Sequence, residues 1–472
     1  MNFEFVRAGS LRFFPILSFV PILWFQYFEE RSHFFLLLTA ALPAFISYAW
    51  ILVRDRDRKS LRFWFAFGLI LRIAFMFSDP ILSEDAYRFL WDGLLIQEGV
   101  SPFAFLPKEF PIEALSPQAR KLAVELLQSM NSPQFYSVYP PILQFFFFLS
   151  AKAMFVFANV KAGILFWKTI LLLSEFGVFW LLYKILINYK IASEKILIYW
   201  LNPLVLVEIT GNAHPESILV FFFAGTLHLF VRWQNENRIR DLFSASAFFL
   251  CGILTKITPL ILVPFLFFSI ANGKRSFLRR QGLWISGTAI AVFVALAWIG
   301  FSFFPELIRK QKTSGLGVFF QLFEFNGSVY YVLREFLRWI GENFYAAGKI
   351  CGASTLVAIS LFSFWKRNEE GPQNVFRTAE SVYLIFLIFS TTVHPWYILP
   401  LIVCSIFSGN IYPIVWSCLI FVSYSAYSVF PYKDSFFWLS FEYGILFLFL
   451  HMDIYEKYRR GTRHSHGTKR PL

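Results

Sequence analysis

The chain has 472 residues, of which 57% are hydrophobic and only 15% are charged. Soluble domains are about 45–50% apolar and about 25% charged, so this composition excludes an ordinary soluble protein. The formal net charge of +13 collects in clusters beside apolar segments and not on one folded surface, which argues against a nucleic-acid-binding protein.

Long apolar runs predict membrane spans, because a helix needs about 20 apolar residues to cross the hydrocarbon core. One run, 283–303, carries no charge. The predicted fold class is all-α, a polytopic transmembrane helical bundle forming a single domain over 1–472. About fourteen spans are expected, near 11–28, 33–53, 61–78, 162–186, 195–210, 214–231, 241–257, 258–270, 283–303, 347–365, 378–392, 396–409, 411–430 and 434–452.

Basic clusters next to spans mark the cytoplasmic side. They lie at 54–62, at 274–280 and in the tail 453–472. With the N-terminus inside, two long loops, 79–161 and 304–346, fall outside. The apolar stretch 142–157 is expected to lie on the outer membrane surface, since a full crossing there would invert the later loops.

The first outer loop begins with the segment SEDAYRFLWDG, residues 83–93. Glu84, Asp85, Arg88 and Asp92 recur at spacings of three and four, so on a helix they share one face. The alternative is an amphipathic surface helix with a solvated charged face.

A second group of ionisable residues lies in apolar surroundings. It comprises His214 and Glu216 in the segment GNAHPE, Lys256 in LTKITP and His394 in HPWY. For each residue alone, the alternative is a snorkelling or internally paired side chain. The predicted topology, however, puts all of them on the outer side, which indicates one cavity at that membrane face.

Such a cavity suits glycosyl transfer from a lipid phosphate. A carboxylate can deprotonate an acceptor hydroxyl, and a lysine or arginine can neutralise a leaving phosphate. No Gly-rich nucleotide loop is evident, which argues against a soluble nucleotide sugar as donor. A lipid-linked-glycan transporter or flippase is the alternative function, but no internal repeat is found. A purely structural membrane subunit would not need this outer cluster.

Taken together, these segments resemble the GT-C superfamily of integral-membrane glycosyltransferases, especially bacterial polyprenyl-phosphate-mannose-dependent mannosyltransferases. The resemblance is carried by SEDAYRFLWDG, YPP at 139–141, NPLVLVEITGNAHPES at 202–217, LTKITP at 254–259, FEFNGSVYYVLR at 323–334 and HPWYILP at 394–400. This chain departs from its relatives in having Glu84-Asp85 where they often have two aspartates. It also has Ala213-His214-Pro215-Glu216 where they often have Gly-His-x-Asp.

The resemblance implies roles for these residues. Asp85, with Glu84 beside it, is the expected catalytic base, and Lys256 and Arg88 are the expected donor-phosphate ligands. The expected substrate pocket comprises Asp92, Tyr139, His214, Glu216, His394 and Tyr397. No cofactor is required by the sequence, and no metal-binding residues are assigned, although relatives differ in their use of a divalent metal.

The predicted function is transfer of a hexose, with mannose preferred, from a polyprenyl-phosphate donor to a lipid, glycan or protein acceptor. The expected location is the inner membrane of a bacterium, with the site facing the periplasm or exterior and with membrane lipids but no nucleic acid as partners.

Overall fold

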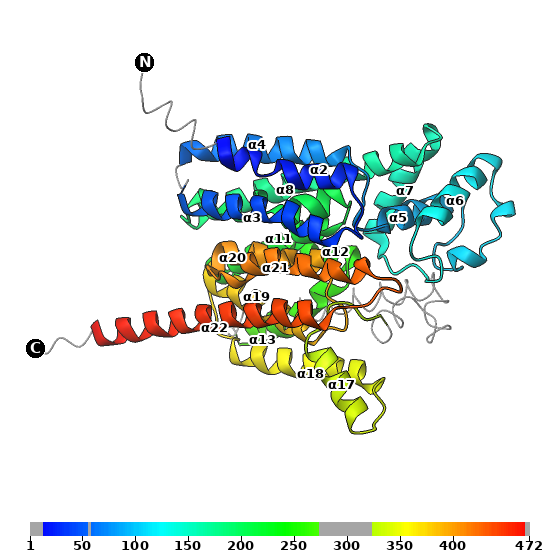
Figure 1. Cartoon of the computed structure of the whole chain (residues 1–472). Helices are drawn as coiled ribbons and strands as arrows, with labels where there is room; N and C mark the ends of the chain where they lie inside the picture. The colour runs from blue at the N-terminus through cyan, green and yellow to red at the C-terminus, as the bar shows by residue number, and fades with distance from the viewer. Residues whose placement is uncertain (1–12, 55–57, 273–322, 468–472) are drawn as a thin grey trace, which may run out of the picture.

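The structure is a computed structural model that describes residues 13–54, 58–272 and 323–467 (Figure 1). The predicted span 283–303, part of the second outer loop and the basic cluster at 274–280 lie outside the described residues. Within these ranges the chain is helical, and its one β-type pairing is an isolated bridge between Phe325 and Thr392. The all-α prediction is therefore confirmed for the described part, while the number of spans stays a prediction.

The helices follow one another with short connections. In chain order they are α2 Val20–Phe28, α3 Phe34–Arg54, α4 Arg58–Met76, α5 Asp85–Gln97, η1 Pro107–Glu109, η2 Ile112–Ala114, α6 Pro117–Ser129, α7 Pro141–Val156, α8 Val160–Asn188, η3 Ser193–Ile196, α9 Leu197–Trp200, α10 Pro203–Val205, η4 Leu206–Gly211, α11 Glu216–Glu236, α12 Ile239–Thr255, η5 Thr258–Leu262, α13 Val263–Ala271, α17 Val329–Trp339, α18 Ala346–Trp365, α19 Pro372–Phe389, η6 Pro395–Ile398, α20 Leu399–Ser408, α21 Tyr412–Leu419, η7 Ile420–Ser428 and α22 Phe436–Gly467.

Several of these helices are long and apolar enough to cross a membrane. Among the described residues they are α3, α8, α11, α18 and the Phe436–Arg459 part of α22. Large apolar side chains on their outer faces stay exposed, for example Leu361 and Trp365 on α18 at 67% and 70%. Exposed apolar surface of this extent marks a lipid-facing wall. The chain is an integral membrane protein.

The bundle has two distinct ends (Figure 1). Helices α5, α6 and α7 gather at one end, and the C-terminal part of α22 projects from the other. Helix α7 packs against α5 and α8 beside this group and not along the length of the bundle. That 142–157 lies on the membrane surface stays a prediction.

The predicted span at 195–210 is a run of short helices instead of one continuous helix. Pro203 interrupts it because proline has no backbone N–H to continue a helix, and the Asn202 side chain caps the next segment by accepting from the Leu204 N–H at 3.0 Å. The run ends in a single π-helical turn, η4, in which the Asn212 N–H reaches the Val207 carbonyl. Such turns are frequent at functional sites.

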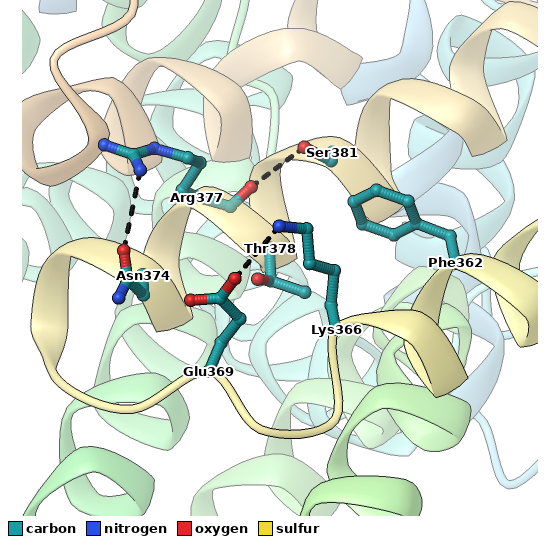
Figure 2. A pocket seen from close by; sticks show the side chains of 7 residues that line it. All are labelled: Phe362, Lys366, Glu369, Asn374, Arg377, Thr378 and Ser381. Atoms are coloured by element: carbon teal, nitrogen blue, oxygen red, sulfur yellow. Dashed lines mark hydrogen bonds and ion pairs between the residues drawn. The ribbon is translucent and has the colours of Figure 1, made fainter. Parts of the chain in front are cut away.

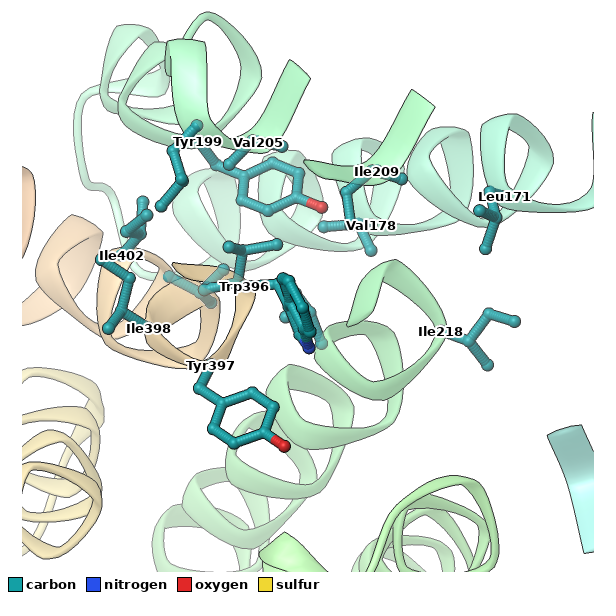
Figure 3. Packing of buried hydrophobic residues seen from close by; sticks show 14 of the residues in the cluster. Leu171, Val178, Tyr199, Val205, Ile209, Ile218, Trp396, Tyr397, Ile398 and Ile402 are labelled. Atoms are coloured by element: carbon teal, nitrogen blue, oxygen red, sulfur yellow. The ribbon is translucent and has the colours of Figure 1, made fainter. Parts of the chain in front are cut away.

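Buried aromatic and aliphatic side chains fill the space between α8, η4, α11 and the segment 395–408. Figure 3 shows Trp396 facing Val178 of α8 and Ile218 of α11, with Tyr397 on the side of Trp396 away from Val178. Trp396 is 7% exposed and Tyr397 is 8% exposed. The N-terminal and C-terminal halves of the chain therefore share one core next to the end that carries α5.

Candidate active site

Helix α5 carries the first predicted motif. Asp85 occupies its first turn, where a carboxylate interacts favourably with the helix dipole. The helix ends at Gln97, and Gly99 follows with φ of +74°, a conformation that glycine adopts without strain. The face with Arg88 and Asp92 is not solvated, because these side chains are 3% and 0% exposed. The alternative of a solvated charged face therefore fails for this helix.

Asp92 and Arg88 form a buried hub beneath the motif. Arg88 Nε donates to Asp92 Oδ1 at 2.8 Å, and Arg88 Nη1 donates to the carbonyl of Phe135 at 2.7 Å. The other Asp92 oxygen accepts from Ser137 Oγ and, at 3.0 Å, from Gln144 Nε2. These contacts fasten the loop before α7 to α5. Hydrogen-bond donors of the protein therefore occupy both oxygens of Asp92. Of the three guanidinium nitrogens of Arg88, only Nη2 lacks a hydrogen-bond partner in the described structure.

Asp85 differs from its neighbours because its carboxylate accepts no hydrogen bond from the described residues. The pKa of Asp85 is raised to about 6, chiefly by burial and also by the nearby charges of Glu84 and Glu216, against the opposing effect of Lys256 and Arg88. The influence of Glu216 and Lys256 places these two residues close to Asp85. A carboxylate with a raised pKa and a free oxygen suits a general base.

Lys256 approaches from the end of α12. The helix stops at Thr255, and Lys256 adopts an extended backbone conformation that turns its side chain toward the N-terminus of α11. Its Nζ lies 2.5 Å from Glu216 Oε1 and 4.0 Å from the centre of the Tyr397 ring. The Lys256 side chain is 23% exposed, whereas Glu216 is 1% exposed. The ammonium group can therefore contact both Glu216 and a ligand.

Both predicted histidines belong to a series of stacked rings. His214 stacks on Trp396 with ring centres 3.4 Å apart, and His394 stacks on Trp396 at 4.5 Å and on Phe325 at 4.8 Å. Below them, Glu208 of η4 lies 3.5 Å from His214 Nε2 and accepts from the Tyr424 hydroxyl at 2.5 Å. The turn 211–216 is held in place because Trp167 Nε1 donates to the Ala213 carbonyl at 2.7 Å.

Tyr139 completes the wall between α5 and α7. Its ring packs edge-on against Phe89 and Phe147, with centres 5.0 and 5.4 Å away. Burial and the charge of Asp85 raise the pKa of Tyr139 well above its usual value, so the phenol stays protonated. The structure therefore brings Tyr139 to Asp85, as it brings Lys256 and Glu216.

Some buried polar atoms at this end have no hydrogen-bond partner in the described part of the chain. They include Arg88 Nη2, Glu216 Oε2 and His394 Nδ1, while Glu208 Oε2 and His214 Nε2 face only each other, at 3.5 Å. Unsatisfied buried donors and acceptors are rare in folded proteins and point to a missing water or ligand. A polar ligand that enters here would meet several of these atoms.

Four functional candidates escaped the sequence reasoning. Arg31 pairs with Glu84 at 2.6 Å, and three aromatic residues from the C-terminal half, Trp396, Tyr424 and Tyr427, contact His214, Glu208 and Arg31. The predicted topology puts the turn between the first two spans, which carries Arg31, on the same outer side as the other candidates. This position was the one sequence signal for Arg31. Trp396 lies in the HPWY segment two positions from His394, whereas Tyr424 and Tyr427 had no sequence signal, because the residues that they contact lie far away in the chain.

No metal site is evident: the described residues contain no group of three or more His, Cys, Asp or Glu side chains placed to hold an ion. A separate hollow lies between α18 and α19 near the Glu369 carbonyl, which bonds Gln234 at the C-terminal end of α11 (Figure 2). Its Lys366 is paired with Glu369 at 2.9 Å. None of the predicted site residues lines this hollow.

Comparison with known proteins assigns the family. A family profile described as "Alpha-(1->6)-mannopyranosyltransferase, N-terminal domain" (the MptA_B family) matches residues 7–272, more than half of the chain. The chain belongs to this family. It is 23% identical over 423 residues to alpha-(1->6)-mannopyranosyltransferase A of Mycobacterium tuberculosis, across 83% of this chain and 74% of that relative. No solved structure matches.

Membership of the MptA_B family confirms the resemblance to membrane mannosyltransferases and makes the chain a glycosyltransferase. It disfavours the flippase alternative. The profile ends at residue 272, so it covers Asp85, Lys256 and Glu216 but not Tyr397, whose ring lies 4.0 Å from the Lys256 ammonium. The C-terminal half of this family member therefore adds residues to the candidate site beyond the matched segment.

Proposed function

We propose that the protein transfers mannose from a polyprenyl-phosphate donor to a hydroxyl of a glycan or other acceptor at the non-cytoplasmic membrane face. The proposal rests on one observation above all. Asp85 of α5, Glu216 of α11 and Lys256 just after α12 come from three separate parts of the chain; Lys256 Nζ lies 2.5 Å from Glu216, and the charges of both act on Asp85. The names of the family and of the mycobacterial relative point to an α-(1→6) linkage as the product.

In the proposed reaction Asp85 removes the proton from the acceptor hydroxyl. The oxygen then attacks the anomeric carbon of the donor while the bond from that carbon to the phosphate oxygen breaks. The polyprenyl phosphate leaves with the bonding electron pair, and the sugar carbon is inverted. A free carboxylate with a pKa of about 6 is ionised at neutral pH and can accept this proton.

Lys256 is placed to stabilise the departing phosphate. Its ammonium group has three donor hydrogens, of which Glu216 occupies one direction and the Tyr397 ring faces another. A third remains for a phosphate oxygen, and Arg88 Nη2 offers a second cationic donor. Such charge-assisted contacts act most strongly where water is excluded.

His214, His394 and Tyr139 are proposed to line the sugar pocket. Asp92 is proposed to support it through Arg88 and the loop before α7. Lipid-exposed apolar faces such as that of α18 offer a surface along which an isoprenoid tail can lie.

The test is an activity assay with purified protein and a panel of sugars carried on polyprenyl phosphate, with GDP-mannose as the control donor. The proposal expects transfer from polyprenyl-phosphate mannose and none from GDP-mannose. Transfer from the nucleotide sugar alone would contradict it.

A further inference from the structure

Arg31 lies outside every sequence motif, in the turn between α2 and α3. Its Nη1 donates to Glu84 Oε2 at 2.6 Å. The Arg31 side chain is 14% exposed and that of Glu84 is 27% exposed, so the pair is largely shielded from water. A shielded pair of this kind constrains both partners more than an exposed one does.

The guanidinium of Arg31 is also held by the C-terminal half of the chain. Nη2 donates to the Tyr432 hydroxyl at 2.9 Å, and the central carbon lies 4.5 Å from the Tyr427 ring centre and 5.2 Å from that of Tyr432. A planar guanidinium with a hydrogen bond on each terminal nitrogen and aromatic rings beside it has little freedom to turn. Arg31 therefore fixes the direction of the Glu84 carboxylate.

The two adjacent acids of the motif consequently have different surroundings. Glu84 Oε2 accepts from Arg31 and, at 3.0 Å, from Asn131 Nδ2. Asp85 accepts no side-chain hydrogen bond from the described residues. Two carboxylates that sit side by side but in different environments can take different roles in proton transfer.

The charges around Asp85 show how Arg31 can act at a distance. Glu84 and Glu216 raise the pKa of Asp85, and Lys256 and Arg88 lower it. The groups that face Asp85 and Glu84 from other elements are Glu216 of α11, Lys256 after α12, Tyr139 before α7, Tyr397 of η6, Tyr427 of η7, Arg31 and Asn131. Arg31 alone among these is a cation paired with Glu84, and it offsets the charge that Glu84 presents to Asp85.

We propose that Arg31 is a positioning residue: together with Tyr427 and Tyr432 it holds and neutralises Glu84, so that Asp85 is the carboxylate left free to act as base. The inference rests on the proposed function and extends it to a residue in the turn between α2 and α3. It also assigns a purpose to the tyrosines at 427 and 432, which lie beyond the segment matched by the family profile.

The test compares pH profiles of kcat/KM for wild type, Arg31→Gln, Arg31→Lys and Tyr432→Phe. Loss of the cation exposes Asp85 to an uncompensated Glu84, so in Arg31→Gln the acidic limb moves to higher pH by about one unit. Arg31→Lys keeps most of the wild-type profile, and Tyr432→Phe shifts it in the same direction by less. In Arg31→Gln combined with Glu84→Gln the acidic limb returns to or below its wild-type position.

Two results would overturn the inference. One is an equal loss of rate at all pH values in Arg31→Gln. The other is a rise in donor KM alone that persists in the Glu84→Gln background, which indicates direct donor contact instead.

A second readout needs no turnover and separates this inference from the proposed function. Protonated carboxyl groups of the purified protein are esterified with a diazo compound over a pH series, and the labelling of Asp85 is followed by tandem mass spectrometry. The labelling midpoint should move upward in Arg31→Gln and not in Arg31→Lys. An unmoved midpoint contradicts the role of Arg31, whereas a moved midpoint without any mannose transfer contradicts only the proposed reaction.

Discussion

Replacing Lys256 by glutamine separates its structural and chemical roles. The Lys256 ammonium donates to Glu216 Oε1 at 2.5 Å, and Glu216 is 1% exposed. Removing one member of a buried pair leaves an uncompensated charge and costs about 3–5 kcal/mol of stability. A matched control is Lys161→Gln, which breaks the Lys161–Asp79 pair near the same end; these side chains are 75% and 52% exposed. Breaking an exposed pair costs at most about 1 kcal/mol.

The assay is the unfolding midpoint of detergent-purified protein together with donor affinity. Lys256→Gln should lower the midpoint far more than Lys161→Gln, and Lys256→Gln with Glu216→Gln should regain most of the stability. Donor affinity of the double variant should stay below that of wild type, because the contact of the Lys256 ammonium with the phosphate is lost. Equal destabilisation by Lys256→Gln and Lys161→Gln would show that the pair is not buried. Recovery of donor affinity in the double variant would reduce Lys256 to a structural role.

Three further predictions follow from the same structure. Because Asp85 must be ionised to act as base and its pKa is about 6, kcat/KM should rise as pH increases through about 6 and then level off; a profile flat from pH 5 to 8 would contradict this. Arg72→Met should lower the unfolding free energy by about 3–5 kcal/mol, because Arg72 and Glu175 form an ion pair that is 0% exposed, and Glu175→Met in the same chain should restore much of it. A cysteine at the exposed Glu342, in a chain whose four native cysteines are replaced, should react with an impermeant thiol reagent added to intact cells; labelling only after permeabilisation would reverse the proposed orientation.

The length of the apolar runs in the sequence predicted the long helices well. The span expected at 33–53 is α3, Phe34–Arg54, and that expected at 347–365 is α18, Ala346–Trp365. The length of such helices is predictable, because a helix needs about 20 apolar residues to cross the hydrocarbon core of the membrane. The expected span 195–210 breaks into short pieces, because Pro203 and the Asn202 cap interrupt it and the last turn is π-helical.

The acids and the lysine of the candidate site could be selected from the sequence, because charged residues beside apolar runs are unusual, and their roles stay a prediction. Their distant partners could not be selected in this way. Arg31 and Tyr432 are 401 positions apart in sequence, and no local pattern reports such a contact. Lys168 and Glu175 could have been recognised in the sequence as residues with buried partners, since ionisable side chains inside a membrane span are usually paired. Lys168 Nζ donates to the Ser78 and Gly211 carbonyls at 2.6 and 2.7 Å, which ties the start of the first outer loop to the turn before α11.

The most direct test of the account is single-turnover transfer of labelled mannose from polyprenyl phosphate by wild type and by Asp85→Asn. The variant keeps the size of the side chain but cannot accept the acceptor proton at neutral pH. The account predicts that donor binding and the unfolding midpoint stay unchanged, while the rate falls by about 10²–10⁴-fold. Transfer by Asp85→Asn at a rate close to that of wild type would contradict the central claim that Asp85 is the base.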